Sequence, residues 1–258
     1  MSARKGAWIL VIALVSCGKG IAQGASARDC AGKLISLQRP ASRVLALSRG
    51  AAEALKAIGT SAAILLAPGG DPPDLVIYDP SHESSLESLG NGIPVFFYDP
   101  ADFKDLADAI MALGALVGDS KGGVRAAARL TASVGRVHAI ISKVHSSDFP
   151  RVLVAAGTDP LCTYGSGSFV AALVAEAGGK PLFADLKGGP IAVGLDEAIS
   201  RDPQVIVSLG QYSLPRGAAF PSSPRVLELR DEDISSPGPS SAAELLELAR
   251  AFHPELIP

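Results

Sequence analysis

The apolar positions between residues 43 and 98 fall into short, unbroken runs bounded by turn-forming residues. The runs are Arg43–Leu47, Leu75–Tyr78 and Pro94–Tyr98. Continuous apolar runs of this length are typical of strands that are covered on both faces in a parallel sheet. After the first run, Ala51, Leu55 and Ile58 recur at helical spacing until Gly59, which predicts a strand followed by a helix.

From residue 101 the apolar positions recur instead at steps of three and four. They are Phe103, Leu106, Ile110, Leu113 and Val117, followed by Leu130, Val134, Val137, Ile141 and Val144. This spacing predicts two helices, or one long helix interrupted by a break at Gly122–Gly123. Since no Pro-rich or Ser-rich stretch marks a flexible tether, we expect residues 101–146 to form a helical rod that joins two lobes.

The alternation of strands and helices resumes after this segment. We predict strands at 151–156, 205–209 and 225–229, helices at 168–177 and 196–201, and a last helix that opens with a capping box formed by Ser241 and Glu244. The fold class is therefore α/β, with two Rossmann-like lobes at 28–100 and 147–258. Ligands of open α/β sheets bind beyond the carboxyl ends of the strands, so a site between the lobes is expected.

The first 27 residues have the features of a secretory signal. Arg4 and Lys5 precede the apolar run Ala7–Val15, which is far shorter than the roughly 20 residues that span a bilayer. Two processing outcomes remain open. Leu14–Cys17 resembles the lipobox of bacterial lipoproteins, in which the cysteine (here Cys17) is acylated, whereas Ala25–Ala27 offers an ordinary small-x-small cleavage site. We expect a periplasmic protein, either free or anchored by lipid.

Composition and charge exclude several classes of protein. With 258 residues, 48% hydrophobic residues and a mean hydropathy of +0.30, the chain can bury a substantial core. A formal net charge of −3 gives no basic patch for nucleic acid, and the basic residues that recur at helical spacing, such as Arg125 and Arg129, are predicted to form a solvated helix face. Cys30 and Cys162 could pair in an oxidising compartment or remain small buried thiols.

An ordered series of matches resembles the vitamin B12 and ferric-siderophore periplasmic binding proteins. The matching stretches are Asp29–Ser48, Ala52–Gly59, Pro73–Ile77, Gly165–Gly179, Leu195–Val207 and Pro237–Pro254. The resemblance implies a helix-hinged, bilobal receptor of an ATP-driven (ABC) importer. Such a receptor captures cobalamin, haem or a ferric siderophore and delivers it to a permease and its ATPase. A monomer without a cofactor is expected.

One departure from the family's pattern concerns the first lobe. The family carries a longer segment between the first helix and Pro73, including a cleft loop and an acidic residue that docks on the transporter. In this chain Leu65–Gly70 leads almost directly into Asp71. The first lobe is therefore expected to lack that carboxylate and part of its ligand wall.

Catalysis has little support in the sequence. The histidines, His82, His138, His145 and His253, do not form the paired spacing of a zinc motif. The segment Gly165–Ser168 lacks the Gly-x-Ser-x-Gly pattern of a nucleophile elbow. We therefore predict a protein that is not an enzyme and has no metal site. Two alternatives remain: a surface lipoprotein without a permease, and a receptor for metal ions.

Candidate ligand contacts follow the predicted strands. Four tyrosines follow strands or lie in the adjoining loops, where each could face a flat macrocycle or lie half in the core: Tyr78, Tyr98, Tyr164 and Tyr212. Ser166 opens a helix whose amides could bind an anionic group, or it is a simple N-cap.

The resemblance adds residues at both cleft loops and on the outer surface. It places Arg49 in the first cleft loop, where it could pair with a carboxylate of the ligand, and Asp233 in the last cleft loop. It matches Asp196 and Glu197 to acidic positions that meet the membrane permease. The alternative for those two residues is a pair of exposed acids stabilised by a helix dipole.

Overall fold

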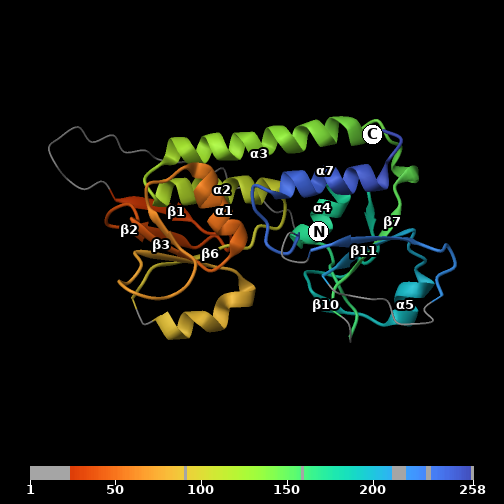
Figure 1. Cartoon of the computed structure of the whole chain (residues 1–258), viewed down its shortest axis with the longest axis horizontal. Helices are drawn as coiled ribbons and strands as arrows, with labels where there is room; N and C mark the ends of the chain where they lie inside the picture. Colours follow the sequence, from red (N-terminus) through yellow and green to blue (C-terminus); the bar gives the residue numbers. More distant parts are fainter. Residues whose placement is uncertain (1–23, 90–91, 158–159, 211–218, 231–233, 257–258) are drawn as a thin grey trace, which may run out of the picture.

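The computed structural model describes residues 24–89, 92–157, 160–210, 219–230 and 234–256. Two α/β halves lie side by side along the long axis, and α3 (Ser120–Ile141) runs across both of them (Figure 1). Each half has its own parallel sheet, so the predicted pair of α/β lobes is confirmed.

The sheet of the first lobe has the strand order β4-β3-β5-β6, and all its pairings are parallel. Its strands are β3 (Arg43–Ala46), β4 (Ala63–Leu65), β5 (Leu75–Tyr78) and β6 (Val95–Phe97). Helix α1 (Arg49–Ile58) follows β3 and ends as predicted at Gly59, whose φ of 80° is the left-handed conformation that glycine adopts without strain. The pattern of unbroken apolar runs thus located three of the four strands and missed β4.

The sheet of the second lobe has the order β12-β11-β7-β9, again with parallel pairings. Its strands are β7 (Arg151–Ala155), β9 (Lys180–Pro181), β11 (Val205–Leu209) and β12 (Arg225–Leu229). Val152 and Val154 belong to the large core cluster under the long helices, while Leu153 and Ala155 belong to a second cluster with Phe183. Both faces of this sheet are therefore covered, which explains its unbroken apolar strands.

The helices fill the space above and below these sheets. They are α2 (Phe103–Leu116), α3, α4 (Phe169–Glu176), α5 (Leu195–Ser200) and α7 (Ser241–Phe252), with the short 3₁₀ helices η1 (Pro80–Leu89) and η2 (Ser146–Asp148). Helix α3 packs against α1 and α2 in the first lobe and against α4 and α7 in the second. The segment 101–146 thus contains two helices, of which α2 folds back along α3 and α3 alone passes between the lobes.

The predicted break at Gly122–Gly123 is wrong. The chain turns instead at residues 117–119, where Gly118 has φ 77° and the Asp119 carboxylate caps α3 by accepting from the amide of Gly122. Gly122 and Gly123 lie in the first turn of α3. A Cβ atom added to Gly123 would be 3.1 Å from the Cα of Gly114 in α2, so this glycine serves a close contact between two helices.

An antiparallel hairpin near the N-terminus was not predicted. Strand β1 (Ala25–Arg28) pairs with β2 (Leu34–Leu37), and Ala25 lies opposite Leu37. The hairpin packs on α2. The predicted boundary between signal and mature domain, after residue 27, falls inside β1.

A second, shorter antiparallel pair joins β8 (Cys162–Thr163) and β10 (Ile191–Ala192) in the second lobe. Cys162 in β8 and Cys30 beyond β1 are both free thiols, so the disulfide that the sequence left open is not formed. Burial raises the pKa of the Cys30 thiol to about 12, so this cysteine stays protonated.

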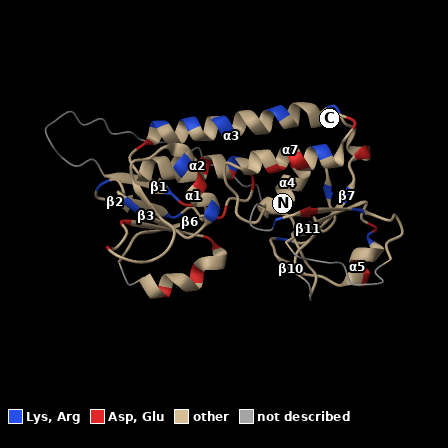
Figure 2. Cartoon of the chain, in the orientation of Figure 1, with Lys and Arg blue, Asp and Glu red and all other residues tan. Residues whose placement is uncertain are grey.

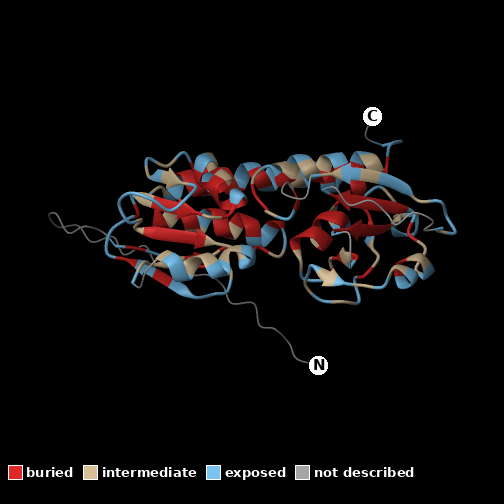
Figure 3. Cartoon of the chain, turned by 60° about the horizontal axis from the view of Figure 1, so that its bottom comes forward, coloured by how far each residue is buried: buried red, intermediate tan, exposed pale blue. Residues whose placement is uncertain are grey.

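Buried residues gather inside both lobes, and charged residues lie on the outer helix faces. Buried positions line the sheets and the inner helix faces of both lobes (Figure 3). Lysines and arginines follow the outer side of α3, where Lys121, Arg125, Arg129 and Arg136 are exposed (Figure 2). None of the helices in the described ranges has the length and apolarity needed to cross a bilayer.

Candidate functional site

The carboxyl ends of the two sheets face each other. Helix α2 begins just after β6 in the first lobe, and α4 follows β7 and β8 in the second. Phe103 and Phe169, the first residues of these helices, are in edge-to-face contact with ring centroids 5.1 Å apart. The starts of α2 and α4 therefore meet at one junction between the lobes.

Polar contacts across this junction form what we call the interlobe seam. It consists of Ser48, Gly50, Glu53 and Tyr98 in the first lobe and of Ser236, Pro237, Gly238 and Ser240 in the segment before α7. The amide of Gly50 donates to Ser236 Oγ at 2.9 Å, and the Ser48 and Ser236 hydroxyls are 3.3 Å apart. Ser240 Oγ donates to Glu53 Oε2 at 2.7 Å. These bonds hold the start of α1 against the segment that leads into the last helix.

The close approach at the seam depends on glycine. A Cβ atom added to Gly50 would lie 2.0 Å from the carbonyl oxygen of Pro237, and one added to Gly238 would lie 3.0 Å from the Cα of Gly50. The predicted capping box at this end of α7 is wrong: no side chain caps the helix, and Ser241 Oγ accepts instead from the amide of Gly238. The serine thus shapes the turn that makes the seam.

Tyr98 was predicted to contact the ligand, but the structure buries it at the interlobe seam. Its side chain is 1% exposed, and its hydroxyl donates to the carbonyl oxygen of Pro237 at 2.9 Å. Burial raises the pKa of this phenol well above its ordinary value, so it remains a donor. The residue joins the lobes because the polar end of a buried tyrosine needs a partner, and the seam supplies one.

Arg49, which the resemblance places in a cleft loop, is exposed and is the first residue of α1. Its Nε donates to Glu53 Oε1 at 3.2 Å, and Glu53 is itself held by Ser240 of the seam. The orientation of the guanidinium is therefore tied to the contact between the lobes. A group in this position is suited to pair with a carboxylate of a ligand at the junction.

Tyr78 forms an aromatic pair with Phe97 at the ends of β5 and β6. The ring centroids are 5.4 Å apart and the rings are tilted by 58°. Both side chains are half-buried, and burial, followed by the carboxylates of Glu83 and Asp29, raises the pKa of Tyr78. The pair offers a partly exposed aromatic surface with a protonated hydroxyl.

The Asp79–His82 pair is a feature that sequence reasoning missed. Asp79 Oδ1 accepts from the amide and hydroxyl of Ser81 and lies 2.8 Å from His82 Nδ1. Burial acts to raise the pKa of Asp79, but the hydrogen bonds from Ser81 and His82 outweigh it, and the pKa lies below its ordinary value. Since an ionised carboxylate only accepts, the proton of a neutral His82 sits on Nδ1, which leaves the lone pair of Nε2 available.

The position of Asp79 and His82 in the sequence could have marked them as candidate site residues. Asp79 and His82 follow Tyr78 at once, beyond the carboxyl end of β5. The neighbouring Asp99, beyond β6, has a raised pKa because of its burial and the charge of Asp79. Polar residues in this place are typical of ligand sites in open α/β sheets.

In the second lobe, Tyr164 is half-buried with its ring against Gly189, where an added Cβ would be 2.6 Å from Tyr164 Cδ1. Ser166 is exposed and donates its hydroxyl to the carbonyl oxygen of Leu186 at 2.8 Å. The cap of α4 is Ser168, whose Oγ accepts from the amide of Ala171. Ser166 therefore holds the loop in front of α4.

The remaining predicted residues are distributed as follows. Tyr212, Asp233 and Cys17 lie outside the described residues. Asp196 and Glu197 are exposed on the first turn of α5. Arg201 donates to Glu197 Oε1 at 2.7 Å and binds both carboxylate oxygens of Asp185.

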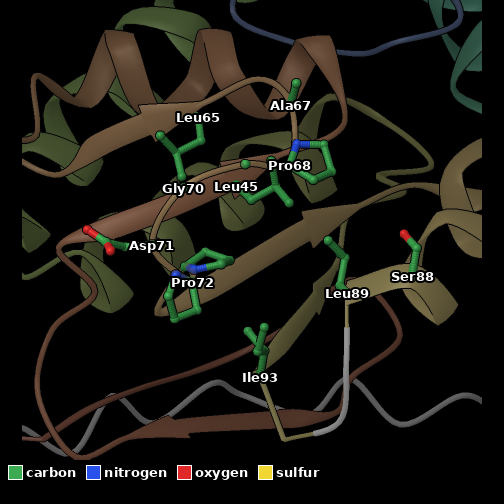
Figure 4. A pocket seen from close by; sticks show the side chains of 12 residues that line it. Leu45, Leu65, Ala67, Pro68, Gly70, Asp71, Pro72, Ser88, Leu89 and Ile93 are labelled. Atoms are coloured by element: carbon green, nitrogen blue, oxygen red, sulfur yellow. The ribbon is translucent and has the colours of Figure 1, made fainter.

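A cavity of about 230 Å³ lies in the first lobe, on the side of the sheet away from α1 (Figure 4). It is lined by the 65–73 loop, by Leu45 of β3 and by Leu89 and Ile93. Leu45 is buried but belongs to neither large core cluster. The cavity is smaller than the ~300–1,000 Å³ of typical ligand pockets, and it coincides with the shortened segment.

Metal ligation by the protein alone finds no support within the described ranges. No group of three or more His, Cys, Asp or Glu side chains there is placed to hold a metal ion. His82 could supply one ligand to a metal whose other positions are already filled.

Comparisons with known proteins agree with this architecture. A family model described as periplasmic binding protein matches residues 72–226. No curated protein matches the chain in sequence.

The solved structures that resemble the chain include three proteins that are named for different ligands. The periplasmic haem-binding protein RhuT from Roseiflexus sp. RS-1 is 20% identical, with a TM-score of 0.68 over 83% of this chain and 98% of that one. The vitamin B12 binding protein BtuF of Vibrio cholerae is 18% identical, with a TM-score of 0.65 over 83% and 98%. A protein of an Fe3+-hydroxamate transport system from Saccharomonospora viridis is 18% identical, with a TM-score of 0.68 over 88% and 98%. At these identities the likeness concerns the fold.

Proposed function

Because this chain belongs to the periplasmic binding protein family, we propose that it captures a corrinoid or an iron chelate between its lobes and delivers it to an ABC permease. Members of the family are periplasmic substrate-binding components of transport and not enzymes. Cobalamin is the first candidate ligand, and haem or a ferric siderophore is the second. The family membership rests on the sequence match. The identity of the ligand and the delivery to a permease are what we propose.

The observation that carries the proposal is the arrangement of the two sheets around one junction. Their carboxyl ends face each other across Phe103 and Phe169. Arg49 follows β3, and the Tyr78–Phe97 pair stands at the last residues of β5 and β6. Tyr164 and Ser166 precede α4 in the second lobe. Broad aromatic surface with a few fixed polar groups is what a large, flat ligand requires.

The Asp79–His82 pair supports a ligand that brings its own metal. A metal-binding histidine usually donates its other ring nitrogen to a carboxylate, as His82 does to Asp79. A single oriented imidazole suits the open axial position of a haem or corrinoid better than an iron already enclosed by a siderophore. We therefore place His82 beside Arg49, Tyr78, Tyr164 and Ser166 in the proposed site.

Binding of three probes tests the proposal. A soluble chain that starts at Gly18 is titrated in a calorimeter with cobalamin, haemin and a ferric hydroxamate. We expect micromolar or tighter binding of at least one probe. Tyr78→Ala and Arg49→Ala should each weaken it about tenfold or more, equivalent to about 1.4 kcal/mol.

The matched control is Arg125→Ala, since Arg125 is exposed on the outer side of α3. This variant should bind like the parent protein. Failure of all three probes to bind at micromolar protein would overturn the receptor assignment. An unchanged haemin spectrum in His82→Ala would remove His82 from the site while leaving the receptor assignment in place.

Docking on a permease is the second half of the proposal. We propose that Asp196 and Glu197 meet basic residues of the permease, as the family resemblance implies. Exposed Glu83 and Glu87 of η1 are the candidate acids of the first lobe, and acidic residues mark both η1 and α5 in Figure 2. They would compensate for the carboxylate lost with the shortened segment.

A transport assay separates this proposal from a lipoprotein that works without a permease. Charge reversal of Asp196 and Glu197 to Lys should reduce uptake of the bound ligand while leaving its affinity unchanged. Uptake equal to that of the parent protein would argue against docking at α5.

A further inference from the structure

Helix α3 carries a row of basic residues along its outer side, across both lobes (Figure 2). Lys121, Arg125, Arg129 and Arg136 follow one another at steps of four, four and seven residues. At 3.6 residues per turn they fall within about 80° of the helix circumference. All four are exposed, and we call them the α3 stripe. Since α3 contains no Asp or Glu, this side of the molecule is locally positive, although the formal net charge of the chain is −3.

The α3 stripe differs from other exposed basic residues because it lacks acidic partners. Within the described ranges, no carboxylate forms an ion pair with any of its members. By contrast, Lys104 Nζ in α2 lies 2.7 Å from Asp108 Oδ2, and Arg39 lies 3.7 Å from a carboxylate oxygen of Asp74. The charges of the stripe are therefore available to a partner outside the chain.

The hydrogen bonds of the stripe do not neutralise it. Arg129 donates to the carbonyl oxygen of Ala57 at 2.8 Å, and Arg136 donates to Ser133 Oγ at 2.9 Å. Both acceptors are uncharged. Because a guanidinium has five N–H donors, each of these arginines retains donors for an anion.

The α3 stripe is a ridge and not a pocket. Ala128, Ala132 and Ala139 are exposed on the same side of the helix, and the lysine and arginine side chains extend beyond their short methyl groups. From Lys121 to Arg136 the stripe runs about 22 Å along the helix axis. A straight, raised row of cations fits an extended anionic surface better than it fits a small ligand.

We propose that the α3 stripe rests on a membrane surface that contains anionic phospholipids. The headgroups of such a bilayer form an extended and laterally mobile layer of negative charge, so several of them can gather under the row of cations at once. A folded acidic protein would need a concave surface of matching length. Since the molecule as a whole is negative, the attraction acts close to contact, within a Debye length of ~8 Å at physiological ionic strength.

Contact through α3 sets the orientation of the molecule on the bilayer. In Figure 2, α3 runs along the top, whereas the acidic residues of η1 and α5 lie at the bottom. With α3 on the membrane, the acids that we propose to dock on the permease face away from it. Membrane contact and docking are therefore alternative states of the receptor. The membrane contact does not depend on the identity of the ligand.

Co-sedimentation with vesicles tests the proposal. The soluble chain that starts at Gly18 contains every described residue and lacks the apolar run Ala7–Val15, which would bind lipid by itself. It is mixed with vesicles of phosphatidylcholine alone or of phosphatidylcholine and phosphatidylglycerol in equal parts. We expect it to sediment only with the anionic vesicles and to be released by added NaCl, because salt screens exposed charges. No sedimentation with the anionic vesicles at low salt would overturn the proposal.

A matched pair of double variants locates the contact. Each basic residue near an anionic surface strengthens binding about fivefold, so Lys121→Ala with Arg125→Ala should weaken vesicle binding about 25-fold. Arg39→Ala with Lys104→Ala removes the same charge from positions outside α3 and should bind like the parent protein. An unchanged stripe variant, or an equal loss in both double variants, would contradict binding through α3.

A tryptophan reporter checks the orientation. Trp8 is the one tryptophan of the sequence, so the chain that starts at Gly18 has none. Ala132→Trp introduces an indole in the middle of the α3 stripe, and its emission should shift to shorter wavelength on the anionic vesicles as it enters the interface. Leu66→Trp, at an exposed position in the 65–73 loop, should keep its emission. The reverse pattern would place another face of the molecule on the membrane.

A soluble polyanion separates the membrane from an acidic protein as the partner. Poly-glutamate offers the same sign of charge without a lipid surface. We expect the parent chain to prefer the anionic vesicles over poly-glutamate at equal concentration of negative charge. Binding of poly-glutamate without binding of the vesicles would overturn the membrane as the partner and indicate an acidic protein instead.

Discussion

The contact between the lobes depends on one hydroxyl group and on one position without a side chain. The Tyr98 hydroxyl reaches the carbonyl oxygen of Pro237, which lies 139 residues further along the chain. The missing side chain of Gly50 lets the same carbonyl approach the start of α1. Tyr98 was predicted to be a ligand contact because it lies at a strand end. It has a structural role instead, which depends on a partner that is remote in the sequence.

Removal of this hydroxyl is expected to destabilise the protein. Tyr98→Phe would leave the buried carbonyl of Pro237 without its donor, at a cost of about 1–3 kcal/mol. The free energy of unfolding from urea denaturation measures the loss. Tyr78→Phe is the control, because Tyr78 is half-buried at the end of the neighbouring strand and outside the seam. Equal stability of Tyr98→Phe and the parent protein would show that the bond contributes nothing.

At the scale of elements, the helical layer depends on a close glycine contact. Gly114 in α2 and Gly123 in α3 approach so closely that a Cβ on either would lie within about 3 Å of the other's Cα. This contact lets α2 pack along α3 before α3 continues to the second lobe. In the sequence, Gly123 together with its neighbour Gly122 looked like a helix break because glycine lowers helix propensity.

Two substitutions in α3 should therefore have opposite effects. Gly123→Ala would force the helices apart and cost about 1–3 kcal/mol. Gly135→Ala, at an exposed position where an added Cβ meets no atom within 4 Å, should stabilise the helix by about 0.5–1 kcal/mol. Denaturant midpoints of both variants check the signs. A neutral Gly123→Ala would mean that the helices separate without cost.

For the whole molecule, two kinds of connection join the lobes. Helix α3 packs on both of them, and the interlobe seam fastens the strand ends below it. A hinge made of one helix and closed by a hydrogen-bonded seam should permit only modest opening. We therefore propose that ligand capture proceeds with little change in shape.

Small-angle X-ray scattering on the free and the ligand-bound protein measures the change in shape on binding. The radius of gyration should agree between the two states within error. In Gly50→Ala, whose new methyl group clashes with Pro237, the free form should be measurably larger than the parent. A clear contraction of the parent protein on binding would contradict a rigid seam.

Local pattern alone determined much of this fold. The unbroken apolar runs located β3, β5, β6, β7, β11 and β12, and helical spacing located α1, α2, α3, α4, α5 and α7, because covered strands and amphipathic helices leave a periodic signature in neighbouring residues. The short strands β1, β2, β4, β8, β9 and β10 were missed. Their few residues carry too little periodicity, and β1 lies in a segment that was read as signal.

Only the tertiary structure decided how these elements use their residues. It separated Tyr98, bonded to Pro237, from Tyr78, which remains partly exposed. It placed Gly123 of the predicted break in a close helix contact with Gly114. It also joined Asp79 to His82 and made Ala25 part of a core. Each of these facts depends on which distant atoms come together in space, and a pattern of neighbouring residues carries no record of that.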